Sequence, residues 1–290
     1  MKKAGWKLSG LLLAAVIALS GCTMAYTGQA EVEKQSFVQQ KKYALITIAS
    51  NKEYSGEQGF FQMFQDNDEI AGINTQPVID ELVPSIRAKF ARTGYFTSVP
   101  MKIIVNHQAY KELDEDEKLY KKAFLKNDLN VAKGYKYFAD KEKLALLARG
   151  LDVDGVICVK MFFSVHAAKS VLGAASSSFL GGIPLSFGSK EYSAMVTTSV
   201  TAYDADGNQI WEDTVVKEAE PGDSTMIVAM DFSDLQGTDF TKMHPSSILI
   251  AQHSVDVVVQ RFKDTMEGKE TDSFQRVKDE KTKEVSLSKS

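Results

Sequence analysis

Short apolar runs and longer amphipathic stretches alternate along the chain, which indicates strands and helices in turn. Apolar runs rich in β-branched and aromatic residues and bounded by turn residues are typical of strands. Such runs cover residues 43–49, 95–99 with a continuation over 101–105, 153–163, 192–203 and 209–216. The run at 153–163 is apolar on both faces, so we expect a central strand there. The run at 192–203 alternates apolar and hydroxyl side chains, which predicts one buried and one wetter face.

Apolar residues spaced by three and four positions predict the first helix, which follows the first strand. Its buried face would hold Ile79, Leu82, Val83, Ile86 and Phe90. Pro77 suits the first turn of this helix, and Gly94 suits the position just past its end. Pro84 should either kink the helix or mark its true start.

The remaining helices are predicted in two regions. Residues 108–149 read as two helices broken near Gly134. The second of these has Asp140 as its cap and buries Leu144, Leu147 and Ala148. Residues 245–262 predict a last helix, whose β-branched content indicates that packing on a sheet stabilises it.

The order of these elements predicts an α/β fold, a mixed β-sheet of about five strands flanked by helices. Asp206-Gly207 separates the last two strands and is typical of a hairpin turn. We expect a single α/β domain over residues 42–266 with an insertion at 167–190. Residues 267–290 are charged and polar, which predicts a disordered tail.

The amino terminus has the features of an export signal. Lys2, Lys3 and Lys7 precede an apolar run, 11–19, which is short for a membrane span of about 20 residues. A basic start, a short apolar stretch and small residues before a cleavage site define a signal peptide. The alternative is an uncleaved anchor helix.

The Leu19-Ser20-Gly21-Cys22 sequence that ends this segment resembles the lipobox of bacterial lipoproteins. The resemblance implies that residues 1–21 are removed and that the Cys22 sulfur carries a diacylglycerol, with a fatty acid such as palmitate completing the anchor. In that class, an Asp directly after the cysteine holds the lipoprotein back from passage to the outer membrane. Thr23 stands at this position, so we expect the protein to pass to the outer membrane. The polar residues 22–41 would then form a flexible tether of roughly 25 Å.

Charge limits the classes of partner. Removing residues 1–21 takes away three lysines and no acids, so the net charge changes from −4 to −7. Phosphate binding needs clustered Lys and Arg, so an acidic domain without a basic stripe argues against nucleic acid. Membrane affinity would come from the lipid on Cys22, at about 0.8 kcal/mol per buried methylene.

Three short motifs carry a resemblance to a known family. Gly94-Tyr95-Phe96 leads from a helix into a strand, Val153-Asp154-Gly155-Val156-Ile157-Cys158-Val159 follows the next helix, and Asp204, Gly207 and Trp211 mark the hairpin. This order resembles the superfamily of the TolB amino-terminal domain, the CsgG curli secretion channel and the lipoprotein activators of penicillin-binding proteins. In this hairpin motif, Asn208-Gln209 replace the acidic residue that is usual in the superfamily. The resemblance covers residues 42–265 and implies a non-enzymatic subunit of a periplasmic assembly or secretion pore.

An uncharged segment, residues 170–189, joins the third and fourth predicted long strands. Its length would allow a membrane hairpin turning at Gly181-Gly182, because a barrel strand crosses a bilayer in about 9–11 residues. Poor alternation and Pro184 argue against this reading. The alternatives for this segment are a flexible loop or docking surface, and a loop that covers a bound ligand.

Catalytic and metal-binding patterns are weak. His107, His166, His244 and His253 are scattered, so we expect no metal site. Asp204, Asp206 and Asn208 faintly resemble a calcium loop, but a hairpin turn explains them. We read Asp114, Glu115 and Asp116 as a solvated helix face and Cys158 as a buried small residue.

These observations predict a non-enzymatic lipoprotein on the periplasmic face of the outer membrane, acting as an adaptor or assembly module. Its partners would be the outer membrane, through the lipid anchor, and an envelope protein; self-association into a homo-oligomer is left open. We expect no cofactor, no metal, no catalytic residue and no nucleic acid. The alternatives are an oligomeric secretion channel that uses residues 170–189 as a membrane hairpin, and a periplasmic solute-binding protein.

Overall fold

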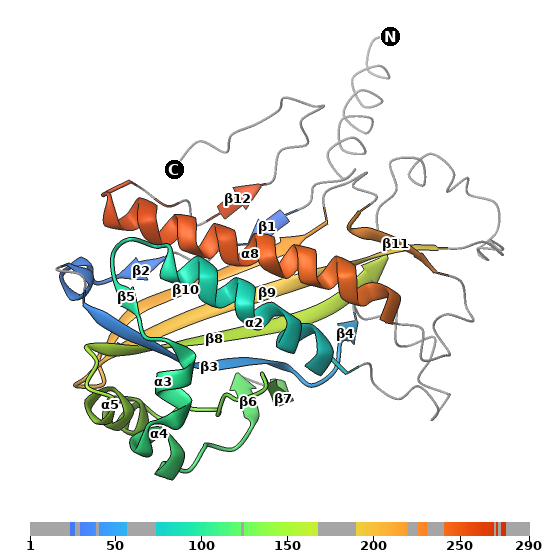
Figure 1. The fold of residues 1–290 in the computed structure, drawn as a ribbon. Coiled ribbons are helices and arrows are strands. Elements are labelled where there is room, and N and C mark those ends of the chain that lie inside the picture. Colours follow the sequence, from blue (N-terminus) through green and yellow to red (C-terminus); the bar gives the residue numbers. More distant parts are fainter. Residues whose placement is uncertain are drawn as a thin grey trace, which may run out of the picture.

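A mixed β-sheet with helices on both faces forms the body of the protein (Figure 1). The computed structural model describes residues 24–26, 30–38, 41–56, 74–122, 125–167, 190–219, 225–230, 241–269, 271 and 274–276. The predicted lipid attachment site Cys22 and the uncharged segment 170–189, for which a loop, a docking surface, a membrane hairpin and a ligand cover were considered, lie outside the described residues.

The main sheet has the strand order β2-β10-β9-β8-β3-β7-β6. Along this path the strands are β2 Glu31–Val32, β10 Gln209–Glu218, β9 Lys190–Asp204, β8 Gly155–Ala167, β3 Lys42–Asn51, β7 Leu125–Val131 and β6 Leu119–Lys122. Strands β3 and β8 are parallel, and the other neighbours on this path pair antiparallel. The α/β fold with a mixed sheet is therefore confirmed.

Shorter strands extend this sheet. They are β4 Ser55–Gly56 on β8, β5 Thr97–Ser98 on β3 and β11 Ile227–Met230 on β9. A separate two-stranded sheet joins β1 Met24–Tyr26 to β12 Phe274–Arg276. All five predicted strands are found, as β3, β5, β8, β9 and β10. The short strands beyond these five were missed because two to seven residues give little periodicity.

Two helical layers cover opposite faces of the sheet. On one face lie α2 Gln76–Ala91 and α8 Met243–Met266. On the other lie α3 Met101–Asn106, α4 Gln108–Glu112 and α5 Lys141–Gly150. Within the described part of the chain, no helix has both the length and the apolar character needed to cross a membrane.

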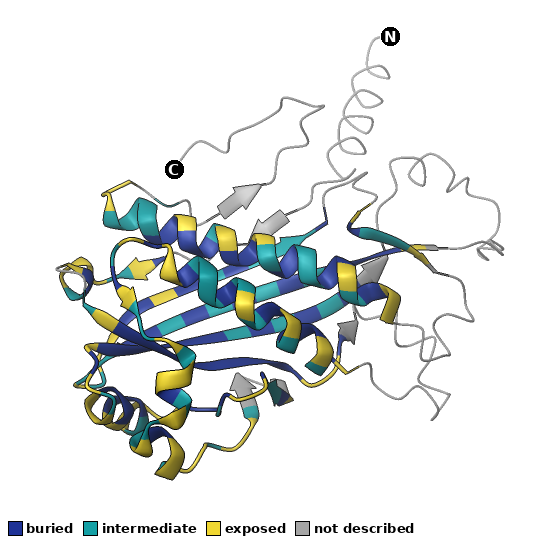
Figure 2. Ribbon diagram, viewed as in Figure 1, coloured by how far each residue is buried: buried dark blue, intermediate teal, exposed yellow. Residues whose placement is uncertain are grey.

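Alternating side chains of β3 and β8 divide between two hydrophobic cores. Leu45 and Ile157 belong to the core beneath α2 and α8, whereas Ala44, Val156 and Cys158 belong to the core beneath α3, α4 and α5. Successive residues of a strand point to opposite faces, so each layer packs on its own set. Figure 2 shows these central strands mostly buried. The prediction of a central strand at 153–163 is confirmed.

Part of the expected tether belongs to the folded domain. Residues 22–41 were predicted to be flexible, yet η1 Lys34–Phe37 places Phe37 in the main core. The Phe37 ring lies 4.9 Å from Tyr43 and 5.0 Å from Phe262. One apolar residue among polar neighbours was too weak a pattern to predict this packing. The tether prediction therefore does not hold for residues 30–38.

Two regions differ from their predicted secondary structure. Residues 101–105 were expected to continue a strand, but Pro100 ends it and α3 begins at Met101, burying Ile104. Residues 108–133 were expected to form a long helix. They form the short α4, which buries its own Tyr110, and then the β6–β7 hairpin, whose strand β7 pairs with β3.

A buried ion pair connects α8 to the sheet. Asp213 of β10 has no exposed surface and accepts hydrogen bonds from Arg261 Nε at 2.9 Å and Nη2 at 3.1 Å. The pair lies beneath α8, near the cluster of Trp211 and Phe262, whose ring centroids are 4.5 Å apart. A buried pair is costly to break, because the remaining charge is left without its partner.

We predict a strong energetic coupling between these two side chains. Arg261→Met alone should lower the free energy of unfolding by about 3–5 kcal/mol, and Asp213→Leu by a similar amount. The double variant should recover at least half of the summed loss, because no charge remains buried. Urea denaturation of the four proteins measures this cycle. Simple additivity of the two single losses would contradict the prediction.

Candidate functional site

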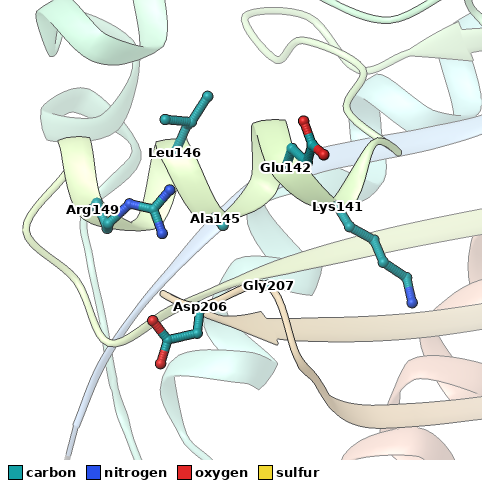
Figure 3. Close-up of a pocket in the computed structure, with 7 residues that line it drawn as sticks. All are labelled: Lys141, Glu142, Ala145, Leu146, Arg149, Asp206 and Gly207. Atoms are coloured by element: carbon teal, nitrogen blue, oxygen red, sulfur yellow. The ribbon is translucent and has the colours of Figure 1, made fainter.

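A shallow hollow lies between α5 and the turn that joins β9 to β10 (Figure 3). Its volume is about 320 Å³. The residues that line it are Lys141, Glu142, Ala145, Leu146, Arg149, Asp206 and Gly207. Two segments more than fifty residues apart in the sequence thus form one surface.

The amino terminus of α5 is held by two carboxylates. Asp140 caps the helix by accepting a hydrogen bond from the backbone N–H of Lys143 at 3.0 Å. Asp116 accepts from the backbone N–H groups of Ala139 and Asp140 at 2.8 and 2.9 Å, and from Lys143 Nζ at 2.5 Å. The predicted cap is therefore confirmed.

The environment of Asp116 corrects one sequence interpretation. Asp114, Glu115 and Asp116 were expected on a solvated helix face, but they lie in the irregular segment between α4 and β6. Burial alone would raise the pKa of Asp116; the hydrogen bonds from Lys143 and the two backbone N–H groups outweigh this and lower it. Asp116 is thus a structural anchor for α5, whereas Asp114 and Glu115 are exposed.

The β9–β10 turn forms the other wall of the hollow. Asp204 Oδ1 accepts hydrogen bonds from the backbone N–H groups of Asp206 and Asn208 at 2.9 and 2.8 Å. Gly207 has a φ of +85°, and a Cβ atom there would lie 3.4 Å from Ala145 Cβ. The predicted hairpin turn is confirmed, and the Asp204 carboxylate is one of the groups that hold it.

The hollow combines charged side chains with an exposed apolar one. Arg149 Nη1 donates to the Ala205 carbonyl oxygen at 2.6 Å, which holds the turn against the end of α5. Leu146 is 52% exposed, one of three large hydrophobic side chains exposed among the described residues. In Figure 3, Glu142 and Leu146 point away from the turn, and the Arg149 guanidinium lies over it.

The four histidines singled out in the sequence lie just before α4, in β8 and in α8. His107 Nδ1 accepts a hydrogen bond from the Ala109 N–H and caps α4, while His253 is exposed on α8. His166 lies in β8, and its side chain is not among those that the structure describes. Across the described segments, no group of three or more His, Cys, Asp or Glu residues could hold a metal ion.

His244 lies in the first turn of α8, where its ring stacks on Tyr54 with centroids 6.3 Å apart. Tyr54 in turn donates a hydrogen bond to Ser247 Oγ at 2.8 Å. The pKa of His244 is lowered, because burial disfavours the imidazolium by more than the nearby Glu81 favours it. The positive end of the helix dipole acts in the same direction as burial.

Cys158 is a buried residue of β8, 2% exposed, as the sequence predicts. Burial raises the pKa of its thiol to about 11. The thiolate is the reactive form of cysteine, so this residue is unreactive at neutral pH.

The hollow itself was not predicted from the sequence. The expected apolar face of α5 contained Leu144, Leu147 and Ala148, and all three are buried. Leu146 lies outside that face. A leucine off the apolar face of the helix is the one sequence signal that could have predicted an exposed apolar position. The contribution of Asp206 and Gly207 could not have been found, because it depends on how the hairpin folds back against the helix.

The fold and the hollow together define an α/β domain with an open surface site. No protein-family model matches the chain, and no curated protein matches it. Among solved structures, the chain is similar to the C-terminal domain of LpoB from Salmonella enterica over 62% of this chain and 83% of that one. The identity is 10% and the TM-score is 0.30, so this likeness carries no argument about function.

We predict that Asp116→Ala lowers the free energy of unfolding by about 1–3 kcal/mol, because two backbone N–H groups and Lys143 lose a charged acceptor. Asp114→Ala is the matched control on the same segment and should change stability by less than about 0.5 kcal/mol, since this side chain is exposed. Urea denaturation at pH 7 compares the two variants. Equal effects would contradict the anchoring role of Asp116.

We also predict that His244 contributes a pH dependence to stability. Burial lowers the pKa of His244, so the folded protein takes up this proton at a lower pH than the unfolded chain, whose histidine has a pKa of about 6.5. The contribution is therefore fully present above the unfolded pKa of about 6.5, and it is lost as the pH falls from there through the lower pKa of the folded state. In thermal denaturation between pH 5 and 8, His244→Gln should flatten the acid-side loss of stability. His253→Gln, on an exposed position of the same helix, should not; parallel curves for all three proteins would refute the prediction.

Proposed function

We propose that this protein is a lipid-anchored, non-enzymatic adaptor or assembly module on the periplasmic face of the outer membrane. The observation that carries the proposal is the Leu19-Ser20-Gly21-Cys22 sequence after a basic and then an apolar segment. Thr23 supports the outer membrane as the destination. The lipid would supply the membrane affinity, and the acidic mature chain would contribute little electrostatic attraction to anionic lipid.

The position of the first strand supports an anchor close to the folded domain. Strand β1 begins at Met24, two residues after Cys22, and it pairs with β12 and contacts β10. In Figure 1 this pair of strands is well separated from α5. The hollow beside α5 would therefore be accessible to other molecules while Cys22 is held in the membrane.

The shape of the hollow favours a protein over a small substrate as its occupant. Small-molecule sites bury most of the surface of their ligand. The hollow here is open, and four of its seven lining residues are charged. An apolar side chain within a charged border is the usual arrangement of a protein–protein contact. This supports an adaptor role over solute binding.

We predict that Cys22→Ala moves the protein out of the outer-membrane fraction, because the modified sulfur is the proposed attachment point. The Cys158→Ala variant is the control: it removes the other cysteine of the chain but should leave the protein membrane-bound. Fractionation of envelopes followed by immunoblotting measures the distribution. A Cys22→Ala protein that stays in the outer membrane as a large oligomer would contradict the adaptor and favour the secretion channel.

A further inference from the structure

The outward face of α5 carries three residues in a symmetric pattern. Glu142, Leu146 and Arg149 follow one another at spacings of four and three, so they form a stripe along one side of the helix. All three are exposed. Neither charged residue forms an ion pair with another residue in the described ranges of the chain. The stripe therefore presents an acid, an apolar side chain and a base to the surroundings.

We propose that this stripe is a self-association surface, on which α5 of a second copy packs antiparallel to α5 of the first about a two-fold axis. The midpoint between positions 142 and 149 falls between Ala145 and Leu146. An antiparallel copy centred there places Glu142 of each chain opposite Arg149 of the other. The two Leu146 side chains then meet at the centre. One surface is thus complementary to itself, which a two-fold interface requires.

The charges around the stripe favour a second copy over an unrelated charged partner. Lys141 and Arg149 are balanced by Glu142 and Asp206, so the surface attracts neither strongly acidic nor strongly basic molecules. Antiparallel helices also bring the negative end of one dipole next to the positive end of the other. Arg149 can join this contact while its Nη1 stays on Ala205, because a guanidinium has five N–H donors.

Leu146 is the apolar centre of the proposed contact. In Figure 3, Leu146 projects outward from α5, on the side of the helix away from the β9–β10 turn. Single exposed apolar residues are common on protein surfaces. The oppositely charged residues on either side of Leu146 distinguish it from Ile103, which is similarly exposed on α3.

The contact is small, which sets the expected affinity. A stable interface buries about 1,200–2,000 Å² in total, and one helix pair with a short turn buries less. We therefore expect weak association in solution and more extensive pairing at the high local concentration of a membrane surface. This inference goes beyond the proposed function, because a self-pairing surface does not depend on which partner the adaptor serves.

Disulfide trapping in the intact envelope tests the geometry. Leu146→Cys places a thiol next to the proposed two-fold axis, and Cys158 is too deeply buried to compete. With copper-phenanthroline as the oxidant, non-reducing gels should show at least about five times more dimer for this variant than for Ile103→Cys. The matched control is 57% exposed against 52% for Leu146. Equal dimer yields would overturn the proposal.

Charge reversal tests the pairing through a second measurement. Glu142→Arg places two arginines against each other across the axis, and Arg149→Glu does the same with two glutamates. Each single variant should weaken association of the detergent-extracted full chain by about tenfold or more in sedimentation velocity. A mixture of the two variants should form a heterodimer, because both opposing pairs then have opposite charges. Thermal denaturation verifies that each variant folds.

These outcomes separate this proposal from the proposed function. A wild-type chain that stays monomeric in detergent and gives no preferential trapping in envelopes would overturn the self-association surface and leave the lipid anchor untouched. Failure of the mixed variants to pair, when each single variant is folded, would also overturn it. The lipid anchor is tested separately, because the Cys22→Ala fractionation measures release of the protein from the membrane.

Discussion

Burial of both faces of β3 and β8 is the constraint on which the rest of the structure depends. These two parallel strands lie at the centre of the sheet, and their side chains alternate between two hydrophobic cores. Neither face can be exposed to water at that point, so a helical layer is needed on each side. The layer of α2 and α8 satisfies one face, and the shorter α3, α4 and α5 satisfy the other. The position of α5, and with it the hollow, follows from this requirement.

Polar contacts then fix elements that apolar packing alone leaves free to slide. Arg261 and Asp213 hold α8 in one register on β10, and Asp116 holds the beginning of α5. At the other end of α5, Arg149 donates to the hairpin turn through Ala205. The hollow is therefore formed by two rigid walls. A surface whose residues are already ordered loses less conformational entropy when a partner binds.

The predictable and unpredictable parts of the fold differ in the range of the interactions that determine them. The alternation in 192–203 and the three-and-four spacing in α2 are local patterns, and both elements were predicted from them. The β6–β7 hairpin, the burial of Phe37 and the role of Asp116 depend on contacts with residues far away in the chain. The turn at Asp204 was predicted because its chemistry is local. The hollow was missed because Asp206 and Leu146 are adjacent only after folding.

The central claim is that the mature chain begins at a lipid-modified Cys22, and one measurement addresses it most directly. Intact mass spectrometry of the protein extracted from native membranes should give the mass of residues 22–290 plus a diacylglycerol and one fatty acid. A mass that corresponds to residues 1–290 without added lipid would contradict the claim.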